Sequence, residues 1–315
     1  MKKKLYNILR LLRPRQWIKN FAVFAAIVFA GRLFEPGPFQ NVVIGFFVFC
    51  ALSSAIYISN DLADIEKDRL HPFKKFRPIV HGDVSIPLAI LLAVILTIAS
   101  FIVGFLFVTP AFFISIVVYA ILQFSYSLVL KNIAVIDILA LAAGYILRVY
   151  AGEFASGFHI SVWLLLTTIS LSLFLAIGKR RSELTLISQY PPQMIAKTRQ
   201  SLSHYSERLL DVYASVFATS TFISYALFTF LESPSRFKIS LGIFMPDFLP
   251  EFFQRKWLMI TIFPVVYGLM KYLQDIYEKH EGESPEKVLL SDRPLIIGVL
   301  LWIFLVITII YVIGS

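Results

Sequence analysis

The chain has 315 residues, of which 58% are hydrophobic and only 16% are charged, and its mean hydropathy is +0.76. This composition excludes an ordinary soluble domain and indicates an integral membrane protein. The net charge of +9 lies mostly between apolar runs, so we expect anionic lipid head groups or phosphate compounds as partners, and no nucleic acid.

Residues 1–17 predict a helix that lies on the membrane surface, because Leu5, Ile8 and Leu12 share one face and Lys and Arg occupy the other. After it come nine apolar runs, each close to the roughly 20 residues that a helix needs to cross a membrane. We expect transmembrane helices near residues 20–34, 41–59, 86–108, 111–130, 133–150, 160–178, 209–231, 257–273 and 294–313.

The placement of Lys and Arg predicts the orientation. Most of the 29 basic residues precede the first run or separate alternate runs, and cytoplasmic loops collect such residues. We therefore predict a single all-α membrane domain over 1–315, with about nine helices around a polar cavity that opens to the cytoplasm. Its N-terminus would lie inside and its C-terminus outside. The inner polar segments, which we expect to border the active site, are 60–85, 179–208 and 274–292.

A polar stretch follows the second apolar run, and no helix breaker occurs until Pro72. If the helix continues, three carboxylates and an amide fall within about 60° on one face. These residues are Asn60, Asp61, Asp64 and Asp68. Like charges this close repel one another unless a cation lies among them, and oxygen ligands with open positions suit Mg²⁺, with Mn²⁺ as an alternative. The other interpretation is a solvated helix end whose acids pair with nearby Lys and Arg.

This Asn-Asp-x-x-Asp-x-x-x-Asp pattern at 60–68 resembles the first aspartate-rich motif of the UbiA-type prenyltransferase superfamily, nine-helix membrane enzymes that bind a Mg²⁺-diphosphate. Members of that superfamily typically carry a second acidic motif after the sixth helix. Here the matching place reads "IGKRRSEL", with Lys179, Arg180 and Arg181. A face that binds metal has become one that would bind phosphate directly.

Four further stretches resemble one branch, the decaprenyl-phosphate phosphoribosyltransferases: "LRPRQWIKN" (12–20), "KKFRPI" (74–79), "YSLVLKNIAVIDILALAAGYILRVYAGEFASG" (126–157) and "SPEKVLLSDRPL" (284–295). The resemblance implies transfer of 5-phosphoribose from 5-phosphoribosyl diphosphate (PRPP) to a polyprenyl (decaprenyl) phosphate, with diphosphate as the second product. It also implies a bacterial inner-membrane enzyme of cell-envelope biosynthesis whose active site faces the cytoplasm. In that reaction Mg²⁺ at Asp61, Asp64 and Asp68 would neutralise the leaving diphosphate. The sequence leaves open whether the enzyme forms a homo-oligomer.

Several basic residues are candidates for contact with the substrate phosphates. Lys19 has the position of an anchor at the membrane surface, but the resemblance favours a phosphate-binding role. Lys75 and Arg77 follow Asp68 closely enough to meet a metal-held diphosphate, although an inner loop is basic in any case. Lys131 is the only cation of its short inner loop, so a phosphate role is favoured.

Asp137 and Arg148 are ionisable groups inside one predicted span, where such groups usually face a cavity or a partner. They are 11 residues apart, which is some 16 Å on a regular helix, so they can share a side but cannot form an ion pair. We expect Asp137 to join the polar cavity, and Arg148 either to join it or to be structural. Asn60, Lys179 and Arg180 complete the candidate substrate-binding residues.

Two other functions compete with phosphoribosyl transfer. A prenyltransferase that moves a prenyl group from its diphosphate to an aromatic or small acceptor predicts a second acidic motif, which this sequence lacks. A lipid transporter or lipid-binding membrane protein would line a path with intramembrane charges. It gives no reason for aligned aspartates beside a cluster of Lys and Arg.

Overall fold

The computed structural model describes residues 2–70, 74–188, 200–232, 256–278 and 285–313. Within these ranges the chain is helical and has no strand, which confirms the predicted all-α class. Eight of the described helices are long and apolar enough to cross a membrane. They are α3 (Pro36–Ala63), α5 (Ile86–Phe107), α6 (Pro110–Leu128), α7 (Ile136–Ser156), α8 (Val162–Ser188), α10 (Glu207–Leu231), η6 (Trp257–Thr261) continued by α12 (Ile262–Glu278), and α14 (Arg293–Thr308) continued by η7 (Ile309–Ile313).

The first predicted span, near 20–34, is not a long α-helix. Residues Pro14–Phe24 form the 3₁₀-helix η1, and α2 (Ala25–Phe29) adds only five residues. Because a 3₁₀-helix rises about 2.0 Å per residue and an α-helix about 1.5 Å, the two together extend roughly 30 Å. The described part of the chain therefore has eight long helical spans, and η1 with α2 is long enough for a ninth crossing.

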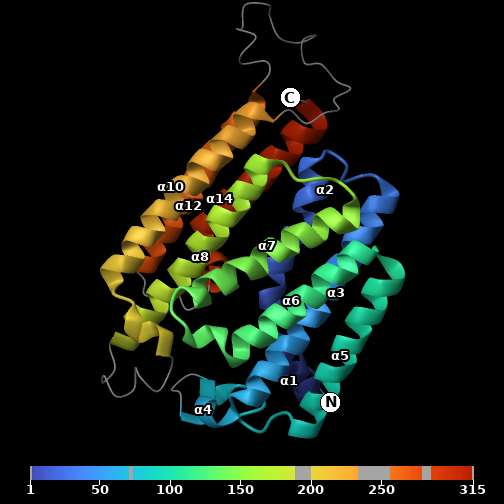
Figure 1. Cartoon of the computed structure of the whole chain (residues 1–315), viewed down its shortest axis with the longest axis vertical. Helices are drawn as coiled ribbons and strands as arrows, with labels where there is room; N and C mark the ends of the chain where they lie inside the picture. Colours follow the sequence, from blue (N-terminus) through green and yellow to red (C-terminus); the bar gives the residue numbers. More distant parts are fainter. Residues whose placement is uncertain (1, 71–73, 189–199, 233–255, 279–284, 314–315) are drawn as a thin grey trace, which may run out of the picture.

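Figure 1 shows the two termini at opposite ends of the bundle, as an odd number of crossings requires. The helices α1 (Lys2–Leu12) and α4 (Ile65–Leu70) lie at the same end as the N-terminus, and α2 lies near the other end. Following the predicted orientation, we refer to the end with α1 and α4 as the inner end.

The helix α3 does not continue unbroken through the acidic stretch. It ends at Ala63, and Asp64 (φ −102°, ψ 13°) separates it from α4. The backbone bonds nevertheless continue, because the Asp64 N–H donates to Asn60 O at 3.0 Å and the Asp68 N–H donates to Asp64 O at 2.8 Å. The predicted single helix is thus corrected to two helices joined at one residue.

The other two predicted inner segments are partly helical as well. The helix α8 extends to Ser188, so Lys179 and Arg180 lie on a helix. The segment 274–292 contains the end of α12 and the helix α13 (Pro285–Ser291). Residues 189–199 and 279–284 lie outside the described residues.

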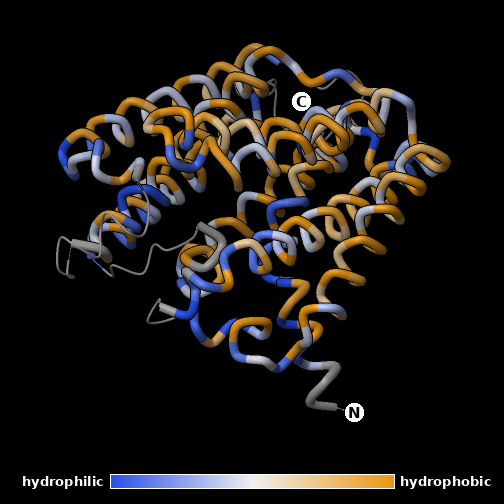
Figure 2. Tube along the Cα trace, turned by 60° about the horizontal axis from the view of Figure 1, so that its bottom comes forward, coloured by the Kyte–Doolittle hydropathy of each residue, from blue (hydrophilic) through white to orange (hydrophobic). Residues whose placement is uncertain are grey.

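The outer surface of the bundle is apolar along the spans, whereas hydrophilic segments gather at the inner end (Figure 2). Large side chains of α5 such as Ile98 and Phe105 are exposed, as expected of a surface in contact with lipid. Inside the bundle, a Cβ added at Gly152 of α7 would lie 1.9 Å from Val23 O of η1. Glycine therefore allows η1 and α7 to approach closely, which places Lys19 and Asn20 beside Arg148.

Candidate active site

Asp61 and Asp68 are buried at the inner end, with 2% and 3% of their surface exposed. Arg77 joins them, because its Nη1 lies 2.9 Å from Asp61 Oδ1 and also contacts Asp68 Oδ2. Arg13, the residue before η1, reaches the same Asp61 oxygen at 2.5 Å. Two carboxylates from consecutive helices thus converge on one guanidinium group.

Asp64 has a different partner. Its Oδ2 lies 3.3 Å from Nζ of Lys131, which belongs to η3 (Leu130–Asn132). Within the described ranges no three His, Cys, Asp or Glu side chains come together in an arrangement that could hold a metal ion. In this structure the three predicted ligands therefore pair with three cations: Asp61 and Asp68 with Arg77, Asp61 also with Arg13, and Asp64 with Lys131. All three carboxylates are ion-paired, as the interpretation of a solvated helix end expects, but Asp61 and Asp68 are buried rather than solvated.

The chemistry of Asp61 and Asp68 nevertheless fits a divalent cation. Burial raises the pKa of the Asp68 carboxyl, and the positive charges of Arg77 and Lys74 oppose that shift. Buried carboxylates of this kind need a positive charge between them. Mg²⁺ is typically bound through one or two carboxylates together with substrate phosphate oxygens, so these two residues are sufficient for such a site.

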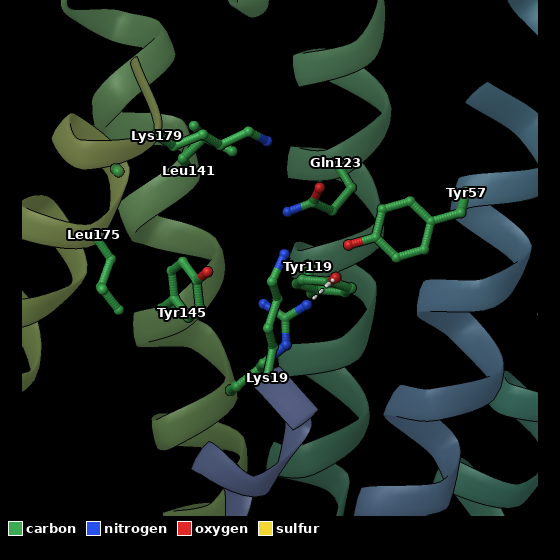
Figure 3. Close-up of a pocket in the computed structure, with 10 residues that line it drawn as sticks. Lys19, Tyr57, Tyr119, Gln123, Leu141, Tyr145, Leu175 and Lys179 are labelled. Carbon is green, nitrogen blue, oxygen red and sulfur yellow. Dashed lines mark hydrogen bonds between the residues drawn. The ribbon is translucent and has the colours of Figure 1, made fainter. Parts of the chain in front are cut away.

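A cavity of about 50 Å³ lies between α3, α6, α7 and α8. Tyr57, one turn before Asp61 on α3, belongs to its wall. The polar ends of Lys179, Gln123 and Tyr57 point into the same space (Figure 3). The full lining consists of Lys19, Tyr57, Tyr119, Gln123, Leu141, Tyr145, Arg148, Leu175, Ala176 and Lys179.

The cavity is cationic. Lys179 of α8 is partly buried and forms no hydrogen bond or ion pair with any described residue. Lys19 reaches the cavity from η1, where its Nζ donates to Gln16 Oε1 at 2.7 Å. The residues that line the cavity include three cations and no carboxylate. Such a surface favours an anionic group, and phosphate oxygens accept strong charge-assisted hydrogen bonds from Lys and Arg.

Arg148 forms part of the cavity wall and is held firmly. Its Nε donates to Asn20 Oδ1 at 2.8 Å, and its Nη2 donates to the Tyr119 hydroxyl at 2.6 Å. Its Nη1 donates to Gly144 O at 2.5 Å, and its guanidinium carbon lies 4.7 Å from the centre of the Tyr119 ring. Arg148 therefore ties η1, α6 and α7 together and adds positive potential to the cavity.

Asp137 pairs with Arg180 and not with Arg148, consistent with the helix spacing. Asp137 and Arg180 are both fully buried, and Arg180 Nε lies 2.6 Å from Asp137 Oδ2, although this N–H does not point along the contact. Arg180 also contacts Glu183 and donates to the Tyr126 hydroxyl at 2.7 Å. The sequence predicts direct phosphate binding by Arg180. In this structure protein groups enclose its guanidinium, and it holds α8 against α6 and α7.

The remaining predicted residues do not line the cavity. Arg181 pairs with acidic side chains of α10. Lys75, in η2 (Lys74–Phe76), is exposed and lies over the Phe76 ring at 5.2 Å. Asn60 is partly buried beside Asp61 on α3.

Several residues of this region were not among the candidates, including the tyrosines of the cavity wall, Arg13, Gln123 and Tyr205. Arg13 has a left-handed φ of 53°, and its side chain contacts Asp61. No sequence pattern predicts that conformation. Gln123 is a polar residue within an apolar run, which was an available signal. Tyr205 donates to Asp137 Oδ1 at 2.7 Å, a contact between distant segments that spacing along one helix does not predict.

Comparison with known sequences adds independent findings. The model of the UbiA prenyltransferase family matches residues 20–181, which include the acidic motif and most of the cavity. The chain is 34% identical over 309 residues to a decaprenyl-phosphate phosphoribosyltransferase of Corynebacterium glutamicum, covering 97% of this chain and 87% of that protein. It is 35% identical over 301 residues to a protein of the same name from Mycolicibacterium smegmatis, covering 94% and 90%.

Solved structures share the fold. A UbiA homolog from Archaeoglobus fulgidus bound to DMAPP and Mg²⁺ matches with a TM-score of 0.67, at 20% identity over 97% of this chain and 99% of that one. The same homolog bound to GPP and Mg²⁺ matches with a TM-score of 0.66, at 21% identity over 96% and 100%. At such low identity the match establishes the helical architecture alone.

Proposed function

The chain belongs to the UbiA prenyltransferase family, and from that premise we propose that it transfers 5-phosphoribose from PRPP to a polyprenyl phosphate with the help of Mg²⁺. Relatives at 34% and 35% identity over nearly the whole chain are named for this kind of transfer. In this proposal the protein lies in a bacterial inner membrane, and its inner end faces the cytoplasm.

The observation that carries this proposal is the cationic cavity at the inner part of α8. Lys179 points into it, and the one acid nearby on the helix, Glu183, contacts Arg180. A prenyltransferase that grips a prenyl diphosphate with two metal-binding faces needs carboxylates in this region. A phosphate group that is bound directly by cations does not need them.

Asp61 and Asp68 would hold Mg²⁺, and Asp64 would be a third ligand once it separates from Lys131. The metal would neutralise the charge that develops on the leaving diphosphate. Arg13 and Arg77 already contact these carboxylates, so they are placed to bind diphosphate oxygens. Breaking the bond between the ribose anomeric carbon and the diphosphate is thus supported mainly by charges at the inner end.

The acceptor needs little activation, because a polyprenyl phosphate is already an anionic nucleophile. Its phosphate oxygen forms the new bond to the anomeric carbon as diphosphate leaves, so the two must lie on opposite sides of that carbon. Lys19 and Lys179 supply direct phosphate contacts in the cavity, and Arg148 supplies a fixed positive charge. Positioning, rather than acid–base chemistry, is therefore the main contribution of the protein.

Membranes that contain the protein, radiolabelled PRPP, a polyprenyl phosphate and Mg²⁺ test the proposal. We expect label to appear in the lipid fraction, and to disappear after chelation or in Asp64→Ala. The control is Asp83→Ala, since Asp83 lies outside the motif beside an exposed His81. Transfer of a prenyl group from its diphosphate to an aromatic or small acceptor, without phosphoribosyl transfer, would show that the alternative function is correct.

A further inference from the structure

Two non-glycine residues of the described chain have a positive φ, Arg13 (53°) and Val135 (68°). Each belongs to a turn that brings a cation to the acidic motif. Arg13 itself contacts Asp61, and the turn that contains Val135 also carries Lys131, which contacts Asp64. A positive φ is a marked outlier for a β-branched residue, and such strain persists only where surrounding contacts impose it. Contacts from elsewhere in the chain must therefore hold Val135 in this conformation.

Tyr205 makes those contacts. It follows η4 (Gln200–His204), and its hydroxyl accepts the Val135 N–H at 2.6 Å and donates to Asp137 Oδ1 at 2.7 Å. Only a group that is both donor and acceptor can do this. Burial and the bond to Asp137 raise the pKa of Tyr205, so the hydroxyl keeps its proton. Tyr205 thus joins the start of α7 to the segment before α10.

Residues 129–137 connect α6 to α7, and we name them the α6–α7 turn. Ser201 of η4 contacts a second part of this turn. Its Oγ lies 2.9 Å from Lys131 O and 3.0 Å from Asp137 Oδ2, so its hydroxyl hydrogen can serve either acceptor. Asp137 Oδ2 also meets Arg180. A continuous set of contacts therefore runs from the buried ion pair through the α6–α7 turn to Lys131 and Asp64.

We propose that Tyr205 is a positioning residue for the transfer reaction, which holds the α6–α7 turn in its strained form and thereby places Lys131 at the acidic motif. This inference rests on the proposed function. Lys131 pairs with Asp64 before substrate binds and is in reach of the diphosphate when Asp64 turns to the metal. Without the Tyr205 hydroxyl the Val135 N–H loses its acceptor, the turn relaxes toward negative φ, and Lys131 withdraws from the motif.

Tyr205→Phe removes the hydroxyl and keeps the ring. We expect the KM for PRPP to rise about 10- to 100-fold, the range found for groups that orient the ligands of a metal site, while the KM for polyprenyl phosphate stays unchanged. The matched control is Tyr213→Phe, because Tyr213 of α10 is partly buried and its hydroxyl bonds to no described residue. Equal changes in both KM values, or no change in either, would overturn the inference.

Val135→Gly, added to Tyr205→Phe, provides a second test. Glycine adopts a positive φ without strain, so the α6–α7 turn can keep its form without the hydroxyl. We expect the double variant to recover most of the lost affinity for PRPP. Failure to recover, with both variants folded by thermal unfolding, would contradict a role through the strained turn. If Tyr205→Phe does not fold, Ser201→Ala tests the other contact with the same two KM values, and an unchanged KM for PRPP would overturn the proposal.

Hydrogen exchange separates this inference from the proposed function, because it requires no activity. In Tyr205→Phe the amides of residues 129–137 should exchange faster than in Tyr213→Phe, while those of α3 and α5 should not change. Unchanged exchange in the turn would overturn the inference even in an active enzyme. Faster exchange in the turn, together with a wild-type protein that transfers no phosphoribose, would support the contacts of Tyr205 with the turn and contradict the proposed function.

Discussion

Arg180 of α8 and Asp137 of α7 are both fully buried, and Arg180 Nε lies 2.6 Å from Asp137 Oδ2. Their neighbours complete a polar cluster in which Glu183 and Tyr126 meet the guanidinium group and Tyr205 meets the carboxylate. This cluster fixes the inner end of α8, so that Lys179, the residue before Arg180, faces the cavity. The buried ion pair thus orients a residue of the cavity wall, although neither member of the pair lines the cavity.

Removing one member of this pair should be costly. Asp137→Asn leaves the buried Arg180 charge without one of its two carboxylate partners, and we expect a loss of about 3–5 kcal/mol in the free energy of unfolding. Thermal unfolding of the detergent-solubilised protein measures it. The control is Asp211→Asn, which breaks a partly exposed pair with Arg181 and should cost about 1 kcal/mol or less. Equal losses in the two variants would contradict the structural role of the buried pair.

Lys179→Met should weaken substrate binding without weakening the fold. A lost charge-assisted hydrogen bond to phosphate is worth about 1.5–3 kcal/mol, so the KM for one phosphorylated substrate should rise about 10- to 100-fold. The midpoint of thermal unfolding should not change, because Lys179 has no hydrogen-bond or ion-pair partner in the described parts of the chain. Lys256→Met, at the opposite end of the bundle, is the control. Unchanged KM values for both substrates would exclude Lys179 from the site.

Mg²⁺ together with diphosphate should stabilise the protein through the acidic motif. At a ligand concentration of about 100 times Kd the expected gain is about 2.7 kcal/mol, seen as a higher unfolding midpoint. Asp68→Asn should abolish this gain, whereas Asp83→Asn should retain it. The proposed metal site is wrong if diphosphate alone gives the same gain, or if Asp68→Asn still responds to the metal.

Gly152→Ala should disturb the contact between α7 and η1. The new Cβ would lie 1.9 Å from Val23 O, and because backbone cannot move aside as a side chain does, we expect a loss of about 1–3 kcal/mol in the free energy of unfolding. Gly268→Ala in α12 meets nothing within 4 Å and should gain about 0.5–1 kcal/mol. Thermal unfolding of both variants checks this pair, and a Gly152→Ala protein as stable as Gly268→Ala would contradict the close approach.

Much of the fold follows from the sequence, because a chain in lipid must satisfy its backbone within each segment and long apolar runs therefore become helices. Six of the nine predicted spans correspond to single helices, and two more combine two elements each, η6 with α12 and α14 with η7. The run near 20–34 departs from the prediction because an apolar pattern does not distinguish 3₁₀ from α-helical backbone. The bend at Asp64 likewise depends on one residue's dihedral angles.

The sequence by itself determined where the candidate residues lie: aspartates at helical spacing at the end of α3 and just beyond it, a cluster of cations at the inner part of α8, and two ionisable groups on α7 too far apart to pair. Only the tertiary structure decided how these residues are used. Lys179 and Arg180 are neighbours that helix geometry turns about 100° apart, and packing sends the first to a cavity and the second to Asp137. The reason is physical, because partners in a buried polar cluster come from segments far apart in the chain, and spacing along one helix says nothing about the helix that will lie against it.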